Sequence, residues 1–248
     1  MKSETTLLFL GLCLFVFSCA SPLPISKLIT DAEHSRWVSG RQYIEQKASD
    51  IGISLSYYKN EGNTLVFDAV IDNYSAQGIH IDPTKVELLA LTHSKEIITR
   101  SFAIDPEEKL LKYDKDESIE RAELANDATA NLFFSATDLV STVAEENNPN
   151  LPEAEKDRRF NQRLYWSEDR ANEMERREAY IESLRNTRQY WEEVPIRKTD
   201  MQPMQYLEGR LFFERNTTAG YYQVIFHLPN GEDITFEYKQ QVIAARGS

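Results

Sequence analysis

The feature that most constrains this fold is an interruption in strand periodicity. Alternation of apolar and polar residues, typical of strands with one buried face, runs through residues 35–104. It stops there and returns only after residue 205. The two blocks of strands must either combine into one domain or form two separate ones.

The clearest strand of the first block is Thr64–Asn73. A turn that contains Asn73, Ser75 and Gly78 leads into a second extended segment, Ile79–Leu91. We expect these segments to form a two-stranded unit, which is not stable alone. Further strands must therefore come from elsewhere in the chain. The residues that share the buried face of the first strand are Leu65, Phe67, Ala69 and Ile71.

The second block supplies those strands. Period-two patterns recur over residues 207–213, 222–228 and 234–238, and Asn230-Gly231 is a strong hairpin signal. An immunoglobulin-type sandwich needs about 100 residues and seven to nine strands, more than either block holds. We therefore predict one antiparallel sandwich built from residues 35–104 plus 205–241, with strands of the second block beside strands of the first.

The segment between the blocks, residues 105–204, has helical periodicity. Apolar residues recur at gaps of three and four from Ile119 to Val143, Asn147–Pro152 breaks the pattern, and a charged arm follows from Glu153 to Trp191. In that arm Phe160, Leu164, Ala171, Met174 and Ile181 lie near a 3.5-residue period, interrupted by Ser167 and Glu178. We predict an α+β fold, an immunoglobulin-like sandwich interrupted by a long helical hairpin whose arms pack on each other.

The N-terminus has the pattern of a signal peptide. Leu7–Phe17 is an apolar run too short to span a bilayer, which takes about 20 residues. It ends in Val16-Phe17-Ser18-Cys19, which resembles the lipobox of bacterial lipoproteins. The resemblance implies a signal peptide over 1–18 and acyl chains on Cys19. The alternative is an ordinary signal peptide cleaved near Ala20 or Ser21.

The resemblance also implies a location. Cys13 would be discarded, and Ala20 after the lipidated residue favours the outer membrane, with the protein facing the periplasm. Residues 19–34 are expected to be a lipidated tether. The body, from Trp37 and Gly40 to Asp82-Pro83, resembles uncharacterised Gram-negative envelope lipoproteins with an immunoglobulin-like sandwich, a resemblance that implies no activity.

Composition and motifs exclude several classes of function. A net charge of −12 argues against binding nucleic acid, which needs clustered Lys and Arg. The chain has no Gly-x-Ser-x-Gly nucleophile motif, no Gly-rich phosphate loop and no His-x-x-x-His spacing. His80 and Asp82 could share a strand face as two metal ligands, but no third ligand is in sight. We predict no catalytic residues, no metal site and no cofactor.

Aromatic residues on the second helical arm are the candidate binding residues. Tyr165, Trp166, Tyr190 and Trp191 lie on a mostly charged helix, where they could anchor an envelope protein. More often such residues pack against the other arm or the sandwich. The favoured function is a non-catalytic interaction or assembly module of the envelope. The alternatives are a small-ligand or glycan binder and, less favoured, a carboxylate-based hydrolase.

Overall fold

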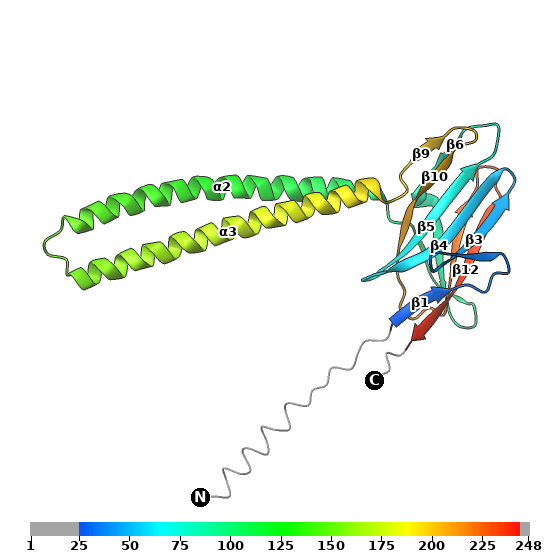
Figure 1. Ribbon diagram of the computed structural model, residues 1–248, viewed down its shortest axis with the longest axis horizontal. Coiled ribbons are helices and arrows are strands. Elements are labelled where there is room, and N and C mark those ends of the chain that lie inside the picture. The colour runs from blue at the N-terminus through cyan, green and yellow to red at the C-terminus, as the bar shows by residue number, and fades with distance from the viewer. Residues whose placement is uncertain (1–24, 244–248) are drawn as a thin grey trace, which may run out of the picture.

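The computed structural model describes residues 25–243 of the chain. The predicted signal peptide and Cys19 lie outside this range. Figure 1 shows a β-sandwich from which two long antiparallel helices project to one side. The predicted α+β fold with a helical hairpin inserted between two blocks of strands is confirmed.

One sheet of the sandwich is built mainly from the first block of strands. All its neighbours are antiparallel. Its strand order is β10 (Tyr206–Glu214), β5 (Thr64–Asn73), β4 (Ile51–Glu61), β3 (Arg41–Ala48) and β2 (Ser35–Val38).

The second sheet combines strands from both blocks and is also antiparallel. Its order is β1 (Ile25–Ile29), β12 (Asp233–Ile243), β11 (Tyr221–His227), β7 (Glu87–Leu91) and β8 (Ile97–Phe102). A separate two-stranded sheet pairs β6 (Ile79–Ile81) with β9 (Thr199–Met201), and a short 3₁₀ turn, η1 (Pro83–Lys85), precedes β7.

The core lies between the two sheets and explains the alternation seen in the sequence. Leu65, Phe67, Ala69 and Ile71 of β5 are all fully buried in it. They meet residues of the opposite sheet, and the ring of Phe67 lies 5.2 Å from that of Tyr238 on β12. Burial of so many apolar side chains in one shared layer makes the two blocks a single domain.

The pairing of the two blocks is confirmed. β10 pairs with β5 along its whole length, from Tyr206 opposite Asp72 to Glu214 opposite Thr64. β11 pairs with β7 in the other sheet, with Val224 opposite Leu88. Neither sheet is complete without strands from each side of the insertion.

Three local expectations are wrong. Segment 64–91 is not a two-stranded unit, because the chain crosses after Asn73 and places β5 and β7 in different sheets. Residues 25–29 are not tether but strand β1, because Ile25–Ile29 pairs with the end of β12. The two sheets also hold ten strands in the described residues, more than the seven to nine expected.

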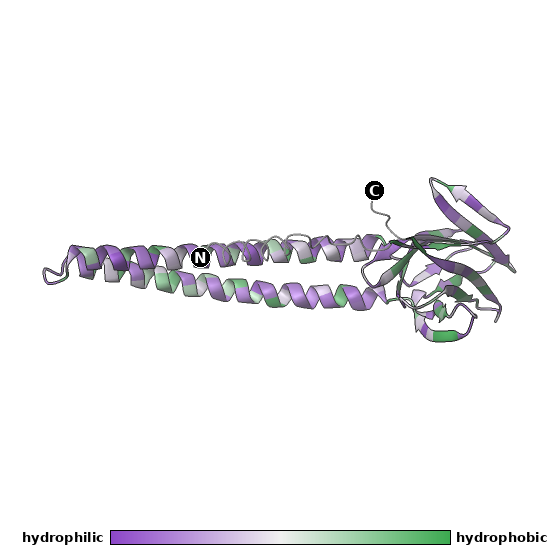
Figure 2. Ribbon diagram, turned by 90° about the horizontal axis from the view of Figure 1, so that it is seen from below, coloured by the Kyte–Doolittle hydropathy of each residue, from purple (hydrophilic) through white to green (hydrophobic). Residues whose placement is uncertain are grey.

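The insertion consists of α2 (Pro106–Glu146) and α3 (Glu153–Glu193), which have 41 residues each. At 1.5 Å per residue each helix is about 60 Å long. Asp105 caps the start of α2, where its carboxylate accepts a hydrogen bond from the Glu107 amide. Figure 2 shows hydrophobic residues along both helices, far from the sandwich.

Candidate partner-binding surface

The base of the hairpin is held by an apolar cluster on the outer face of the first sheet. Trp191 of α3 and Leu110 of α2 pack with Val66 and Phe212, which are paired neighbours on β5 and β10. The rings of Trp191 and Phe212 have centroids 4.8 Å apart. Because Leu211 and Phe213 point into the sandwich, Phe212 between them points outward to receive the hairpin.

This cluster corrects two of the predicted partner-binding residues. Trp191 is buried and only 9% exposed, and Tyr190 is half-buried against Phe212 at a ring distance of 6.2 Å. Both rings fix the hairpin to its own sandwich. They are therefore not available as anchors for a partner.

A polar clamp lies beside the cluster. The guanidinium groups of Arg41 and Arg210 lie 4.5 and 4.0 Å from the ring centroid of Tyr58. Both donate hydrogen bonds to Asp68, that from Arg210 being 2.9 Å long. Cation–π stacking and charged hydrogen bonds thus tie β3, β4, β5 and β10 together where the hairpin begins.

Beyond the base, ion pairs replace apolar contacts between the helices. Ile181 and Leu184 of α3 are buried near the sandwich. Farther out, Arg177 donates hydrogen bonds to Glu120 at 2.7 Å, to Asp127 at 3.2 Å and to Glu123. We call the ion-paired contact between α2 and α3, from Glu117 and Arg185 outward to the tip, the charged seam.

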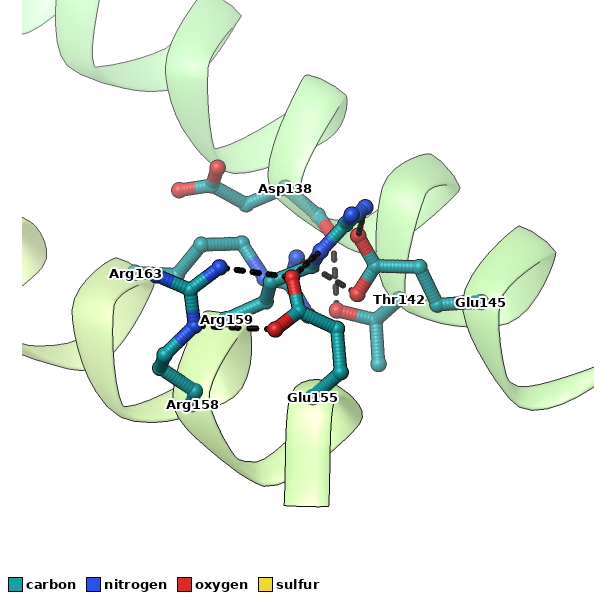
Figure 3. A network of polar contacts seen from close by, with 7 residues as sticks. All are labelled: Asp138, Thr142, Glu145, Glu155, Arg158, Arg159 and Arg163. Carbon is teal, nitrogen blue, oxygen red and sulfur yellow. Dashed lines mark hydrogen bonds and ion pairs between the residues drawn. The ribbon is translucent and has the colours of Figure 1, made fainter. Parts of the chain in front are cut away.

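The charged seam continues to the tip of the hairpin. Arg170 donates to Asn131 at 2.9 Å, and its guanidinium lies 5.2 Å from the ring of Phe134. Figure 3 shows the distal end, where Arg163 donates to Glu145 at 2.8 Å. Arg163, Arg170 and Arg177 are seven residues apart, so they lie on one face of α3.

These ion pairs lower the pKa of several carboxyl groups in the hairpin. Hydrogen bonds from Arg185 and Arg121 lower the pKa of Glu117, and hydrogen bonds from Arg163 and Arg159 lower the pKa of Glu145. Hydrogen bonds from the neighbouring guanidinium groups of its own helix lower the pKa of Glu155 to about 2. The carboxylates are therefore ionised at neutral pH, and the Arg side chains of α3 are occupied by them.

Because the charged side of α2 faces α3, its apolar side faces away. Seven residues at alternating gaps of three and four form one stripe, and all seven are exposed. Leu132 is 75% exposed and Leu139 is 67% exposed, although both are large and apolar. We call this set the outward stripe; its members are Ala122, Ala125, Thr129, Leu132, Ala136, Leu139 and Val143.

The two arms pack on each other as predicted, but α2 meets α3 through charged residues and leaves the outward stripe exposed. The sequence does contain a signal for the observed arrangement. Arg163, Arg170 and Arg177 recur every seven residues on α3, and Asp138 and Glu145 recur at the same interval on α2. Matching heptads of opposite charge can pair across an antiparallel hairpin, but the apolar stripe of α2 is a competing face, so the pattern alone does not choose between the two.

The remaining predicted anchors lie on the same distal half of the hairpin. Tyr165 is 62% exposed and Trp166 is 50% exposed, with ring centroids 5.5 Å apart. Phe160 and Leu164 are exposed near them on α3. These residues are accessible, in contrast to Tyr190 and Trp191.

The sandwich places the two candidate metal ligands, His80 and Asp82, in separate contacts. Nδ1 of His80 lies 2.7 Å from Asp200, whereas Asp82 accepts a hydrogen bond from the Thr84 amide and caps the 3₁₀ turn η1. His80 and Asp82 are thus not joint ligands. Over the described range, no three His, Cys, Asp or Glu side chains are grouped to hold a metal ion.

Two further observations bear on the class of protein. None of the helices in the described part of the chain is apolar enough over a sufficient length to cross a bilayer. No protein-family model matches the chain, and neither a curated protein nor a solved structure matches it significantly.

Proposed function

We propose that this protein is a non-catalytic docking module of the bacterial cell envelope and that the helical hairpin is its working part. The observation that supports the proposal is the outward stripe on α2. A helix that turns its charges inward and its leucines to solvent has a surface suited to binding another protein.

The energetics favour an occupied stripe. Burial of apolar surface is favourable by about 25 cal/mol per Å², and contiguous exposed apolar patches on monomers rarely exceed a few hundred Å². The outward stripe extends from Ala122 to Val143, with Phe133 and Val140 exposed beside it. Covering these side chains would release water from a surface about 32 Å long.

The chemistry of the stripe defines the kind of partner. From Leu124 to Ala144 the only charged residues are Asp127 and Asp138, and both accept hydrogen bonds from Arg side chains of α3. The exposed face is thus uncharged, and its spacing is that of a coiled-coil seam. The matching partner is a helix with apolar residues at gaps of three and four.

A membrane surface fits this stripe less well. Helices that lie on anionic lipid carry Lys and Arg on the polar face. The hairpin has 22 Asp and Glu against 13 Lys and Arg, and many of its Arg side chains form ion pairs within the hairpin. The proposed attachment to the membrane is instead the lipid on Cys19, which would hold the module at the periplasmic face of the outer membrane.

Site-specific photo-cross-linking tests the docking function. A photoreactive residue at Leu132 should give a defined cross-linked product in cells, whereas the same residue at Glu175, exposed on α3, should give none. Leu139→Asp should abolish the Leu132 product without lowering the melting temperature, because Leu139 is exposed. Products of equal yield from both sites, or a product insensitive to Leu139→Asp, would contradict docking through the stripe.

A further inference from the structure

We infer that the partner of the outward stripe is a second copy of this chain, bound antiparallel across a two-fold axis between residues 130 and 131 of α2. The inference rests on the proposed docking function and names its partner. Two hairpins joined in this way would form a four-helix bundle with the sandwiches at opposite ends.

The first argument is the complementarity of the stripe with itself. In an antiparallel pair about this axis, a core residue of one copy faces the residue of the other copy that lies equally far on the opposite side of the axis. The two residue numbers therefore add up to 261. Leu139 then faces Ala122, Leu132 faces Thr129, and Ala136 faces Ala125. Each leucine meets a smaller residue, so no two leucines face each other and only the Ala136–Ala125 layer pairs two alanines.

The parallel arrangement lacks this fit. There each residue faces its own copy, so Leu meets Leu at positions 132 and 139 but Ala meets Ala at positions 122, 125 and 136. Helices cannot approach closely at Ala136 while pairs of leucines hold them apart one turn away on either side. The distribution of side-chain sizes therefore selects the antiparallel pair.

Charges at the ends of the stripe select the same arrangement. Continued outward, the core positions are Ser118 and then Lys115 on one side and Glu146 on the other, and all three are exposed. In the antiparallel register Lys115 faces Glu146 of the second copy at both ends. A parallel pair would place Lys115 against Lys115 and Glu146 against Glu146, which is unfavourable.

The length of α2 allows this pairing without a collision. Glu146, the last residue of α2, would lie opposite position 115 of the second copy. Position 115 is nine residues from the start of α2 at Pro106, about 14 Å along the helix axis. The tip of each hairpin therefore ends before it reaches the other sandwich.

The contact also avoids repulsion between two acidic hairpins. The outward stripe itself has no charged member, and Asp127 and Asp138 are neutralised by Arg177 and Arg170 on the side away from the contact. In the described part of the chain, neither Lys115 nor Glu146 has an ion-pair partner. They are free to pair with the second copy.

Cross-linking between two tagged copies of the full chain tests this inference in cells. One copy carries Ala125→Cys and the other Ala136→Cys, and a short bis-maleimide reagent is added. The antiparallel pair predicts a product between these two copies. It predicts no product between two copies that both carry Ala125→Cys, because those positions would be about 16 Å apart along the axis. The chain without added cysteines controls for reaction at Cys13 or Cys19.

A charge reversal gives a second readout. Lys115→Glu should lower the yield of the Ala125–Ala136 product several-fold, and adding Glu146→Lys on the same chains should restore it. A product only between two Ala125→Cys copies would overturn the antiparallel pair. If no product forms between copies but the Leu132 photo-cross-link joins a different protein, the partner is not a second copy, and the proposed docking function still holds. Loss of both signals would overturn the docking function as well.

Discussion

The ring of Trp191, at the end of the hairpin, lies 4.8 Å from that of Phe212, on the outer face of the sandwich. This contact joins the hairpin to the sandwich. It makes Tyr190 and Trp191 part of the folded base, whereas Tyr165 and Trp166 remain exposed. We expect Trp191→Ala to lower the free energy of unfolding by about 3 kcal/mol, because a large ring is removed from a buried cluster. Denaturant unfolding monitored by circular dichroism measures the change.

The matched control is Trp166→Ala on the same helix. Trp166 is 50% exposed, so its replacement should change the free energy of unfolding by less than about 0.5 kcal/mol. Equal losses from the two substitutions would show that Trp166 also belongs to a core.

The charged seam should make pairing of the two helices depend on pH. Glu117 and Glu145 have a lowered pKa in the folded state, so their contribution to stability is present above the unfolded value, about 4.3. It is lost as pH falls through the folded values, when protonation removes the charge that holds Arg185 and Arg163. The melting temperature of the hairpin should therefore fall as the pH drops below the unfolded value of about 4.3.

Glu145→Gln separates this effect from general acid unfolding. The substitution removes the titrating group but keeps a similar shape. The variant should therefore have a lower melting temperature than the native chain at pH 7, and the difference between the two should be smaller at pH 3. Melting followed by helical circular dichroism gives the comparison. A native hairpin as stable at pH 3 as at pH 7 would contradict a stabilising role for the seam.

The sandwich should fold without the hairpin. Replacement of residues 106–193 by a short Gly/Ser linker leaves both sheets and the β6–β9 pair intact. Phe212→Thr should accompany the replacement, because Phe212 loses its cover. We expect cooperative unfolding and a strand-type circular dichroism spectrum.

Truncation after residue 204 is the contrasting case. It removes β10, β11 and β12, so β5 and β7 lose partners and the core between the sheets loses ten of its 25 buried residues. The shortened chain should aggregate, since unpaired strand edges associate. A soluble, folded product ending at residue 204 would show that the first block is a domain by itself.

Lipidation of Cys19 is predicted from Val16–Cys19 after an apolar run. Cys19→Ala should abolish labelling by a clickable fatty acid and move the protein from the membrane fraction to the soluble fraction. Cys13→Ala is the control and should leave both properties unchanged. Persistent labelling of Cys19→Ala would show that the chain is not a lipoprotein of this type.

Much of the fold follows from local sequence patterns. Alternation of apolar residues in Thr64–Asn73 and heptad spacing in α2 identify strand and helix, because each period matches the geometry of its element. The gap between the two blocks of strands also indicates an insertion, since neither block can form a sandwich alone. The strand and helix inferences need only the residues of one segment at a time, and the inference of an insertion needs only the lengths of the blocks.

Which strands pair with each other does not follow from local sequence patterns. The second extended segment after Asn73 crosses to the other sheet, and Ile25–Ile29 becomes a strand only because the end of β12 lies beside it. A short strand has little stability of its own, so its neighbours decide whether it forms. No local pattern in those residues reveals the neighbour.

The orientation of α2 shows most clearly which features follow from the sequence and which depend on the tertiary structure. Its sequence presents two heptad faces, one apolar from Ala122 to Val143 and one polar that includes Asp138 and Glu145, and burial of the apolar face is the ordinary expectation. The sequence by itself determined that both faces exist on one helix. Only the tertiary structure decided which face meets α3, because the choice depends on Arg163, Arg170 and Arg177 of a helix on the other side of the turn. Their charges pair with the polar face, and the leucines remain in solvent.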